Sequence, residues 1–197
     1  MMGSGIENGF GFMGMLKLRR RALIAMLALA LLMAFQGTAL ALSWAMTDGF
    51  ESSSASTTWT FFGDGTHTGS LKYSATYARS GYYYARLTAS NGGWSTVGRT
   101  VNLWPYTNVQ SSSSCTAGAY VRSLNGSSEI IVEVINPATW SPLAIQSHTV
   151  SSSTSYTWIS SPGWAVNRGD VFVRIEVVSG TYSEVVYVDD MKVTCYW

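Results

Sequence analysis

Apolar and polar residues alternate in short runs along most of the chain, which is the pattern of β-strands with one buried face. In 171–178 the odd positions are Val or Ile, while Phe172, Arg174 and Glu176 occupy even positions. The closing stretch 184–197 alternates less strictly because two aspartates interrupt it. Both stretches are predicted to be long strands that turn one face to the core.

Clusters of Gly, Asn, Ser and Pro separate these runs at intervals that suit a β-sandwich. Helix signals are nearly absent beyond residue 41. We therefore predict an all-β domain, a two-sheet antiparallel β-sandwich, preceded by an N-terminal hydrophobic signal helix. The predicted strands are 44–50, 70–77, 82–88, 97–103, 117–123, 129–135, 155–160, 171–178 and 184–197.

One pair of these runs is separated by Asn125-Gly126, and Asn-Gly is the strongest short-range signal of a β-hairpin. We expect 117–123 and 129–135 to pair through this turn. Such pairing would set Arg122 opposite Glu133 on one face of a sheet.

The first part of the chain has the layout of a secretory signal peptide. Lys17 and Arg19–Arg21 precede the uncharged apolar run 22–35, and small residues lead to a cleavage site near Ala41. We expect removal of residues 1–41 and secretion of the rest. The first residues of this segment look like an over-extended N-terminus that precedes the true start. An uncleaved membrane anchor is the alternative, because no charge appears from Ala22 to Met46, a stretch long enough in principle to span a bilayer.

The remaining segment, 42–197, is a comfortable size for a single domain with one hydrophobic core. It has eight Lys and Arg against ten Asp and Glu, a net charge of −2. The basic footprint of nucleic-acid binding is absent, so we expect no nucleic-acid partner, and no membrane contact after cleavage. Cys115 and Cys195 are its two cysteines, and export favours a disulfide between them. Two independent buried thiols are the alternative.

Several short motifs follow one another in a characteristic order. The segment 48–51 reads Asp-Gly-Phe-Glu, and 186–193 reads Val-Tyr-Val-Asp-Asp-Met-Lys-Val, with 78–87, 118–122 and 156–158 between them. This order resembles the CenC-type carbohydrate-binding modules, which implies a galactose-binding-like jelly roll over nearly all of the mature chain. Because the motifs are short, the resemblance is more specific for the fold than for the ligand.

The resemblance also implies a structural calcium ion between the N-terminal motif and the closing strand. It names Glu51 and one of Asp189 or Asp190 as side-chain ligands, and Asp48 is added because it is close in sequence. Carboxylate and carbonyl oxygens are the ligands that calcium prefers. The alternative is that nearby lysines or backbone amides neutralise these carboxylates.

Sugar binding needs flat apolar surfaces and a few polar groups that orient hydroxyls. Trp59 and Trp158 fall where the family has core aromatics, so they are assigned to packing. Aromatic residues in or beside turns are easier to present to a ligand, although core packing is the alternative for each. These candidates are Trp94, Trp104, Tyr106, Trp140 and Trp164.

Charged residues on strand faces form a second set of candidates. Arg122 and Glu133 are expected to face each other, and Arg174 and Glu176 share one strand face. Together they would line the concave sheet of a sandwich and bond sugar hydroxyls. A solvated face with ordinary cross-strand pairs is the alternative.

No enzyme activity is expected from these residues. His67 and His148 are isolated in Ser- and Thr-rich stretches, and no nucleophile elbow or His-rich metal motif occurs. Adjacent Asp189 and Asp190 are expected to point to opposite faces of a strand, which is the wrong geometry for glycoside hydrolysis. A pair of glutamates on the sheet face is the formal alternative.

We therefore expect a secreted, non-catalytic, stand-alone module that binds a polysaccharide or glycan through surface aromatics. One alternative is a structural or adhesive extracellular protein that uses the same sandwich for protein or matrix contacts. Another is a glycoside-hydrolase-associated protein. Fold alone does not choose among these functions.

Overall fold

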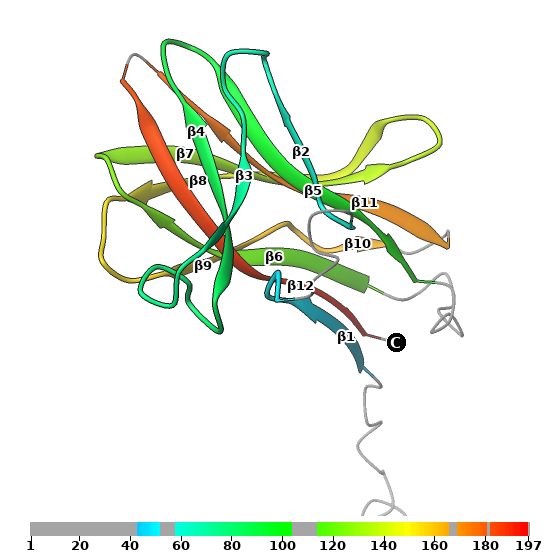
Figure 1. The fold of residues 1–197 in the computed structure, drawn as a ribbon. Helices are drawn as coiled ribbons and strands as arrows, with labels where there is room; N and C mark the ends of the chain where they lie inside the picture. Colours follow the sequence, from blue (N-terminus) through cyan, green and yellow to red (C-terminus); the bar gives the residue numbers. More distant parts are fainter. Residues whose placement is uncertain (1–42, 52–57, 104–113, 166–168, 181, 197) are drawn as a thin grey trace, which may run out of the picture. The chain divides into compact units, whose positions relative to one another are not determined.

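The computed structural model describes residues 43–51, 58–103, 114–165, 169–180 and 182–196 (Figure 1). All of them belong to the unit Leu42–Trp197. They form two antiparallel sheets, one of seven strands and one of five. No helix within these described ranges is long and apolar enough to cross a membrane. The predicted two-sheet antiparallel sandwich is confirmed, whereas the N-terminal signal helix falls outside the described residues.

Twelve strands make up the described part of the chain. In chain order they are β1 (Ser43–Asp48), β2 (Thr60–Gly63), β3 (Ser70–Tyr73), β4 (Tyr83–Ala89), β5 (Trp94–Asn102), β6 (Ser114–Ser123), β7 (Ser127–Asn136), β8 (Ser141–Ser151), β9 (Thr157–Ser160), β10 (Trp164–Ala165), β11 (Asp170–Val178) and β12 (Glu184–Tyr196).

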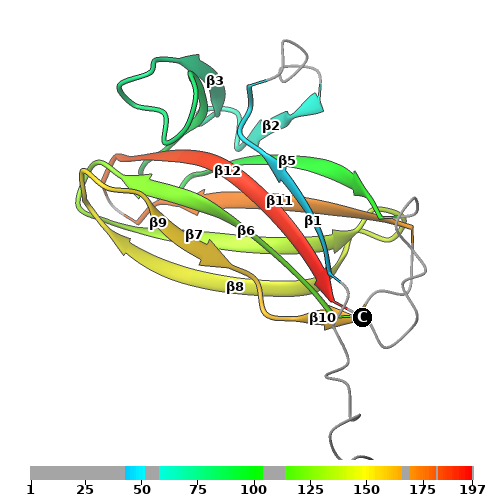
Figure 2. The same cartoon turned by 90° about the horizontal axis from the view of Figure 1, so that it is seen from below.

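The larger sheet, called sheet A, is organised around β12. Strand β6 pairs along one edge of β12, while β4 pairs with the first half of the other edge and β1 with the second half. Strands β9 and β10 continue the sheet beyond β6, and β3 continues it beyond β4. Figure 2 shows β9, β6, β12 and β1 side by side. The closing strand is therefore central to its sheet.

The smaller sheet, called sheet B, has the strand order β2-β5-β11-β7-β8. Its central strand β11 shows the alternation expected from the sequence: Val173, Ile175 and Val177 are buried in the core. The neighbouring side chains of β11 project from the other side of the sheet. The side of each sheet that faces away from the core is called its outer face below.

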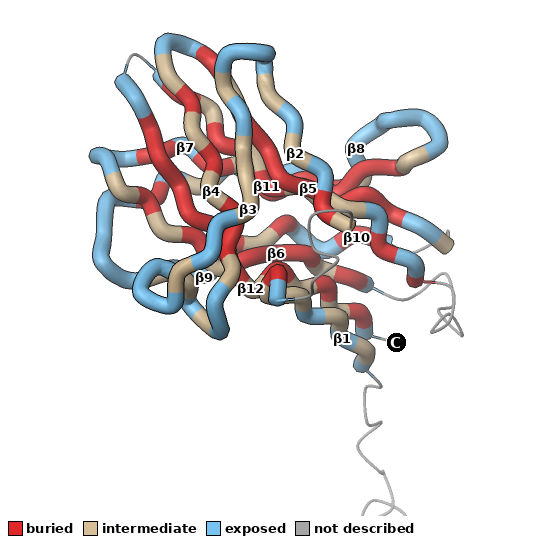
Figure 3. The backbone as a smooth tube through the Cα atoms, viewed as in Figure 1, coloured by how far each residue is buried: buried red, intermediate tan, exposed pale blue. Residues whose placement is uncertain are grey.

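The core lies between the two sheets and is dominated by small and branched apolar side chains. Figure 3 shows buried stretches in β4, β6 and β12 of sheet A and in β5 and β11 of sheet B. Phe50 and Trp59 pack with ring centroids 4.6 Å apart, and Trp59 is 2% exposed. The assignment of Trp59 to packing is confirmed.

The predicted pairing of 117–123 with 129–135 is wrong. Strand β6 belongs to sheet A and β7 to sheet B, so the turn at Gly126, whose φ is 69°, carries the chain between the sheets. Each strand already has partners on both edges, β12 and β9 for β6, and β11 and β8 for β7. The local turn signal was correct, but pairing was decided by strands distant in sequence.

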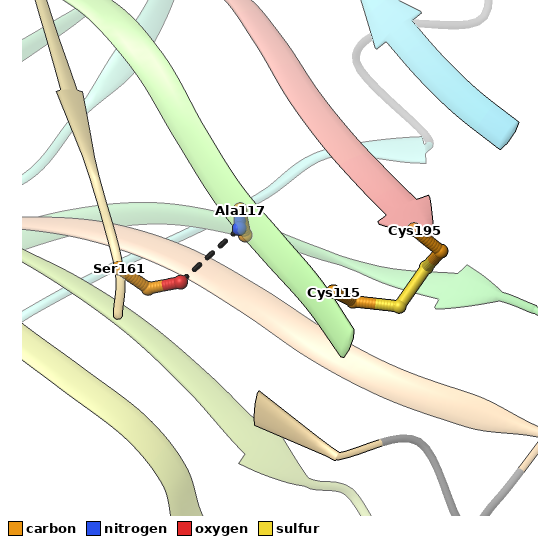
Figure 4. The surroundings of a disulfide bond; sticks show 4 residues. All are labelled: Cys115, Ala117, Ser161 and Cys195. Atoms are coloured by element: carbon orange, nitrogen blue, oxygen red, sulfur yellow. Dashed lines mark hydrogen bonds between the residues drawn. A yellow bond between two sulfur atoms is a disulfide. The ribbon is translucent and has the colours of Figure 1, made fainter. Parts of the chain in front are cut away.

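Cys115 and Cys195 form a disulfide across 80 residues, as predicted (Figure 4). They are direct cross-strand partners of β6 and β12 and are fully buried. Beside them, the backbone N–H of Ala117 donates to Ser161 Oγ over 3.1 Å. The disulfide therefore joins two adjacent strands of sheet A within the core.

Candidate functional site

The outer face of sheet B brings an aromatic group and a charged group together. On β11, Phe172, Arg174 and Glu176 occupy successive outward positions. The register places Glu133 of β7 directly beside Arg174, and Gly98 of β5 on its other side. Three of the predicted sugar-contacting residues on strands, those at 133, 174 and 176, therefore share one surface.

Three aromatic side chains meet at one end of this face. The ring centroid of Phe172 lies 5.5 Å from that of Trp140 and 6.2 Å from that of Phe62. Phe172 is 6% exposed, whereas Trp140 is 61% and Phe62 38% exposed. The two outer rings flank a buried one, so their free faces are open to a ligand.

The turn between β7 and β8 fixes the position of Trp140. Its backbone N–H donates to the Asn136 carbonyl over 2.8 Å, and the N–H of Ala138 donates to Asn136 Oδ1 over 3.0 Å. Trp140 itself has a φ of 55°, a left-handed conformation that is uncommon for a bulky residue. This geometry directs the indole toward Phe172 on β11 rather than along the strand.

Gly98 provides the space that the Phe172 ring occupies. A Cβ atom at residue 98 would lie 2.7 Å from Cζ of Phe172 and 2.9 Å from Cβ of Arg174, closer than real Cβ contacts allow. The absent side chain lets both residues lie across β5. The sequence signal for this contact was a glycine inside a strand, which often marks a close approach.

The charged group consists of one arginine between two glutamates. Arg174 Nε donates to Glu133 Oε2 over 2.6 Å, and Arg174 Nη2 lies 3.5 Å from Glu176 Oε2. Glu133 is nearly buried. Burial raises the pKa of Glu176, an increase that Arg174 opposes and Glu133 reinforces. The guanidinium holds both carboxylates in fixed positions, where their remaining lone pairs accept hydrogen bonds from hydroxyl groups.

The other predicted candidates do not join this surface. Arg122 projects from sheet A, where its Nε donates to the Ser153 carbonyl over 2.8 Å. Trp164 is 4% exposed in β10 and offers no free ring face. Trp94 begins β5 and is half-buried, with its N–H bonded to Asp64. Trp104 and Tyr106 lie outside the described residues.

Three aromatic positions differ from the expectation. Trp158 is 39% exposed on sheet A, so its assignment to the core is wrong. It projects from the outer side of β9, while its neighbour Ile159 takes the core position. Phe62 and Phe172 were not among the candidates, although Phe172 alternates with core residues and shares the outward parity of Arg174.

The predicted calcium ligands lie in one region but have other partners. Glu51 Oε1 accepts the backbone N–H groups of Tyr82 and Tyr83 over 2.8 and 2.7 Å. Asp48 forms an ion pair with Arg99 and accepts the N–H of Phe50 over 2.9 Å. Two of the four carboxylates are therefore neutralised by an arginine and by amides.

Asp189 and Asp190 both contact the β3–β4 connection. Asp189 Oδ2 accepts the N–H of Arg79 over 2.7 Å, while Asp190 pairs with the Arg79 guanidinium and accepts from Ser80 Oγ over 2.8 Å. A β-bulge lies here, and Asp190 has a φ of 45°. Because the bulge breaks the alternation of the strand, the expectation of opposite faces is wrong.

This donor set does not fit a calcium site as it stands. Within the described ranges, no three His, Cys, Asp or Glu side chains gather around one point where an ion could bind. Arginines occupy the carboxylates of Asp48 and Asp190, and backbone amides occupy those of Glu51 and Asp189. The calcium ion implied by the resemblance is untested, and a chelation measurement decides between it and carboxylates neutralised by arginines and amides.

Both histidines have partners, so the expectation that they are isolated is wrong. His67 Nδ1 lies 2.8 Å from Asp64 Oδ2, and His67 Nε2 lies 2.7 Å from Ser90 Oγ. His148 Nε2 lies 2.8 Å from the Ser160 carbonyl. The contacts of His67 join the turn after β2 to the turn before β5, and strand pairing rather than sequence proximity brings these turns together.

The hydrogen bonds of His67 to Asp64 and Ser90, called the His67 latch below, connect the turn after β2 to the turn before β5. The hydrogen bond from His67 lowers the pKa of the Asp64 carboxyl below its usual range. The neighbouring N–H groups of Gly92 and Gly93 already donate to the carbonyls of Gly180 and Ser90. These two amides are therefore not free to stabilise an oxyanion, which acyl transfer would require.

Comparison with known proteins gives a partial family match. The model of the PKD domain matches residues 21–103, less than half of the chain. In the structure the matched strands divide between the sheets, with β1, β3 and β4 in sheet A and β2 and β5 in sheet B. Strands β1 and β4 pair with β12, and β5 pairs with β11, so the matched segment is part of the larger sandwich. No curated protein matches the chain.

Several solved structures with similar folds are carbohydrate-binding modules. TmCBM61 in complex with β-1,4-galactotriose has a TM-score of 0.51 at 15% identity, covering 74% of this chain and 92% of that one. The CBM22-1 xylan-binding domain from Paenibacillus barcinonensis has a TM-score of 0.52 at 12% identity, covering 75% and 91%. The family 11 module from Clostridium thermocellum, in complex with a β-1,3-1,4-mixed-linked tetrasaccharide, has a TM-score of 0.50 at 11% identity, covering 79% and 96%. The chain thus shares the jelly-roll fold of these modules over most of its length.

Proposed function

We propose that the protein is a non-catalytic module that binds a polysaccharide through the outer face of sheet B. The observation that carries this proposal is the convergence of Trp140, Phe172 and Phe62 with the Arg174 ion group on one sheet surface. Exposed ring faces stack against the C–H faces of sugar rings, and fixed polar groups orient the hydroxyls. The similar modules include one in complex with β-1,4-galactotriose, a xylan-binding domain, and one in complex with a β-1,3-1,4-mixed-linked tetrasaccharide, which supports a neutral polysaccharide as the ligand.

Rigidity of the site supports binding rather than catalysis. Glu133 and Glu176 are both held by the same guanidinium, so neither is placed as a free acid or base across a substrate bond. The site lies on strands and on a tight turn, which preserve its geometry before the ligand arrives. Binding would then cost little conformational entropy.

Affinity electrophoresis on galactan, xylan and mixed-linkage glucan tests the proposal. We expect retardation in at least one polysaccharide, weakened about tenfold by Glu176→Ala because a hydrogen bond to a charged group is lost. Lys72→Ala is the control, because Lys72 is exposed on β3 of sheet A and lies outside the surface on sheet B. Migration unaffected by every polysaccharide would refute the proposal and favour a structural or adhesive role.

We further propose export of the protein with cleavage near Ala41. The proposal is supported by the basic and apolar N-terminal segment and by the Cys115–Cys195 disulfide, which persists in oxidising compartments. Intact mass of the protein recovered from the culture medium is the test. A mass that includes residues 1–41 would contradict cleavage.

A further inference from the structure

The outer face of sheet A carries a second cluster of aromatic and charged residues, unrelated to the surface on sheet B. The register of three neighbouring strands places Arg86 of β4, Tyr187 of β12 and Arg122 of β6 in one row. The Arg122 guanidinium lies 6.0 Å from the centroid of the Tyr187 ring. Two arginines therefore flank one tyrosine across the centre of the sheet.

Neither arginine has a carboxylate partner in the part of the chain that the structure describes. The ion pairs found there involve Arg79, Arg99 and Arg174 instead. Arg122 Nε donates to a backbone carbonyl, and the buried Nε of Arg86 has no hydrogen-bond partner among the described atoms. Arginine stays charged at all ordinary pH values, so this row presents uncompensated positive charge.

A second row adds aromatic surface next to the arginines. Strand pairing aligns Tyr120 of β6 with Trp158 of β9, and their ring centroids are 5.1 Å apart. The Trp158 ring also lies against Gly118, where a Cβ would be 2.6 Å from Trp158 Cζ2. The Arg79 guanidinium covers the other side of this pair, 3.5 Å from the Tyr120 centroid. Trp158 is held in place while 39% of it stays exposed.

Charge is segregated between the two outer faces. The face of sheet A and its β3–β4 connection carry Lys72, Arg79, Arg86 and Arg122. The acids near this face are Asp190, which pairs with Arg79, Asp189, which is fully buried, and Glu51, which bonds to backbone amides. The face of sheet B carries Glu129, Glu133 and Glu176 with Arg174.

We propose that the outer face of sheet A is a second ligand surface, which binds an anionic polysaccharide that bears carboxylate groups. Guanidinium groups bind carboxylates through paired hydrogen bonds, and Trp158 offers a flat surface for a sugar ring. Tyr187 itself is 7% exposed and packs against Tyr77 and Tyr84, so Arg86 and Arg122 would each contact a separate charged group on either side of it. The surface is distinct from the neutral-sugar site on sheet B, and each would function without the other.

Binding to polygalacturonate, followed by calorimetry at increasing salt, tests this surface. We expect binding by the wild-type protein that weakens with ionic strength, because charge pairs at a surface are screened. The double variant Arg86→Gln/Arg122→Gln is expected to lose about tenfold or more in affinity through two charged contacts. Trp158→Ala, at a partly exposed position, is a second variant, and its thermal midpoint is compared with that of the wild type to check folding. Arg174→Gln on the other face is the control and should leave polygalacturonate binding unchanged.

Several outcomes would overturn the proposal. These are no binding of polygalacturonate by the wild-type protein, binding that is insensitive to salt, or equal binding by the Arg86→Gln/Arg122→Gln and Trp158→Ala variants. If DNA or phosphatidylglycerol vesicles bind with equal affinity and the same variants weaken that binding, the surface recognises polyanions in general and not a polysaccharide. Galactan, xylan and glucan binding, measured in parallel, reports on the sheet B site alone, so failure of one surface is distinguishable from failure of the other.

Discussion

Truncation of Trp140 gives the sharpest test of the sheet B surface. Trp140 is 61% exposed, and a tryptophan offers about 250 Å² in total, so about 150 Å² of it is accessible. A sugar ring covers one face, roughly half of that area. At about 25 cal/mol per Å², burial of about 75 Å² contributes about 2 kcal/mol to binding. Trp140→Ala is therefore expected to raise the dissociation constant about thirty-fold.

The assay is isothermal calorimetry with the neutral oligosaccharide whose polymer retards the protein most. Tyr196→Ala is the matched control, because Tyr196 is 51% exposed but belongs to β12 of sheet A. Since Trp140 has a φ of 55°, Trp140→Gly should bind as weakly as Trp140→Ala while relieving backbone strain. A change below about threefold in Trp140→Ala, or an equal loss in Tyr196→Ala, would refute the stacking argument.

Three further predictions concern stability. Removal of the Cys115–Cys195 disulfide, by reduction or by Cys115→Ala/Cys195→Ala, should lower the free energy of unfolding by about 4 kcal/mol, because the disulfide closes a loop of 80 residues. Urea titration measures this change, and an unchanged unfolding midpoint would contradict the prediction. The pKa of Asp64 is lowered in the folded state, so the contribution of the latch is present above its unfolded pKa and is lost as the pH falls below about 4. Asp64→Asn should flatten this part of the stability profile, and an unaltered profile would show that the latch contributes nothing. Because arginines and amides neutralise the carboxylates at 48, 51, 189 and 190, a chelator should leave the thermal midpoint unchanged. A fall in the midpoint that added calcium reverses would establish a bound calcium ion.

The carboxylates around the β-bulge of β12 show where the family resemblance and the structure differ. The sequence indicated that carboxylates at 48, 51, 189 and 190 would lie near one another. Those at 51, 189 and 190 do contact the β3–β4 connection or the start of β4, whereas Asp48 pairs with Arg99 of β5. Their partners could not be read from the sequence. Arg79 is a neighbour of Asp190 only because a bulge and a positive φ turn that carboxylate toward the loop.

The sequence by itself determined the features that depend on local periodicity and on composition. Alternation in 171–178 is set by the two-residue repeat of a strand, so it predicted which side chains of β11 face the core. Scarcity of helix signals predicted an all-β fold, and two cysteines in a chain expected to be exported predicted their pairing. These inferences need no knowledge of which strands are neighbours.

Only the tertiary structure decided which of these strands lie together. The Asn-Gly turn between β6 and β7 looked like a hairpin, but each strand pairs with partners far away in the chain, which separates Arg122 from Glu133. Long-range pairing likewise assembles Trp140, Phe172 and Phe62 from three segments and leaves Trp158 exposed over Gly118. Local propensity fixes the faces of a strand, whereas its neighbours are chosen by burial of the whole core, which no short segment encodes.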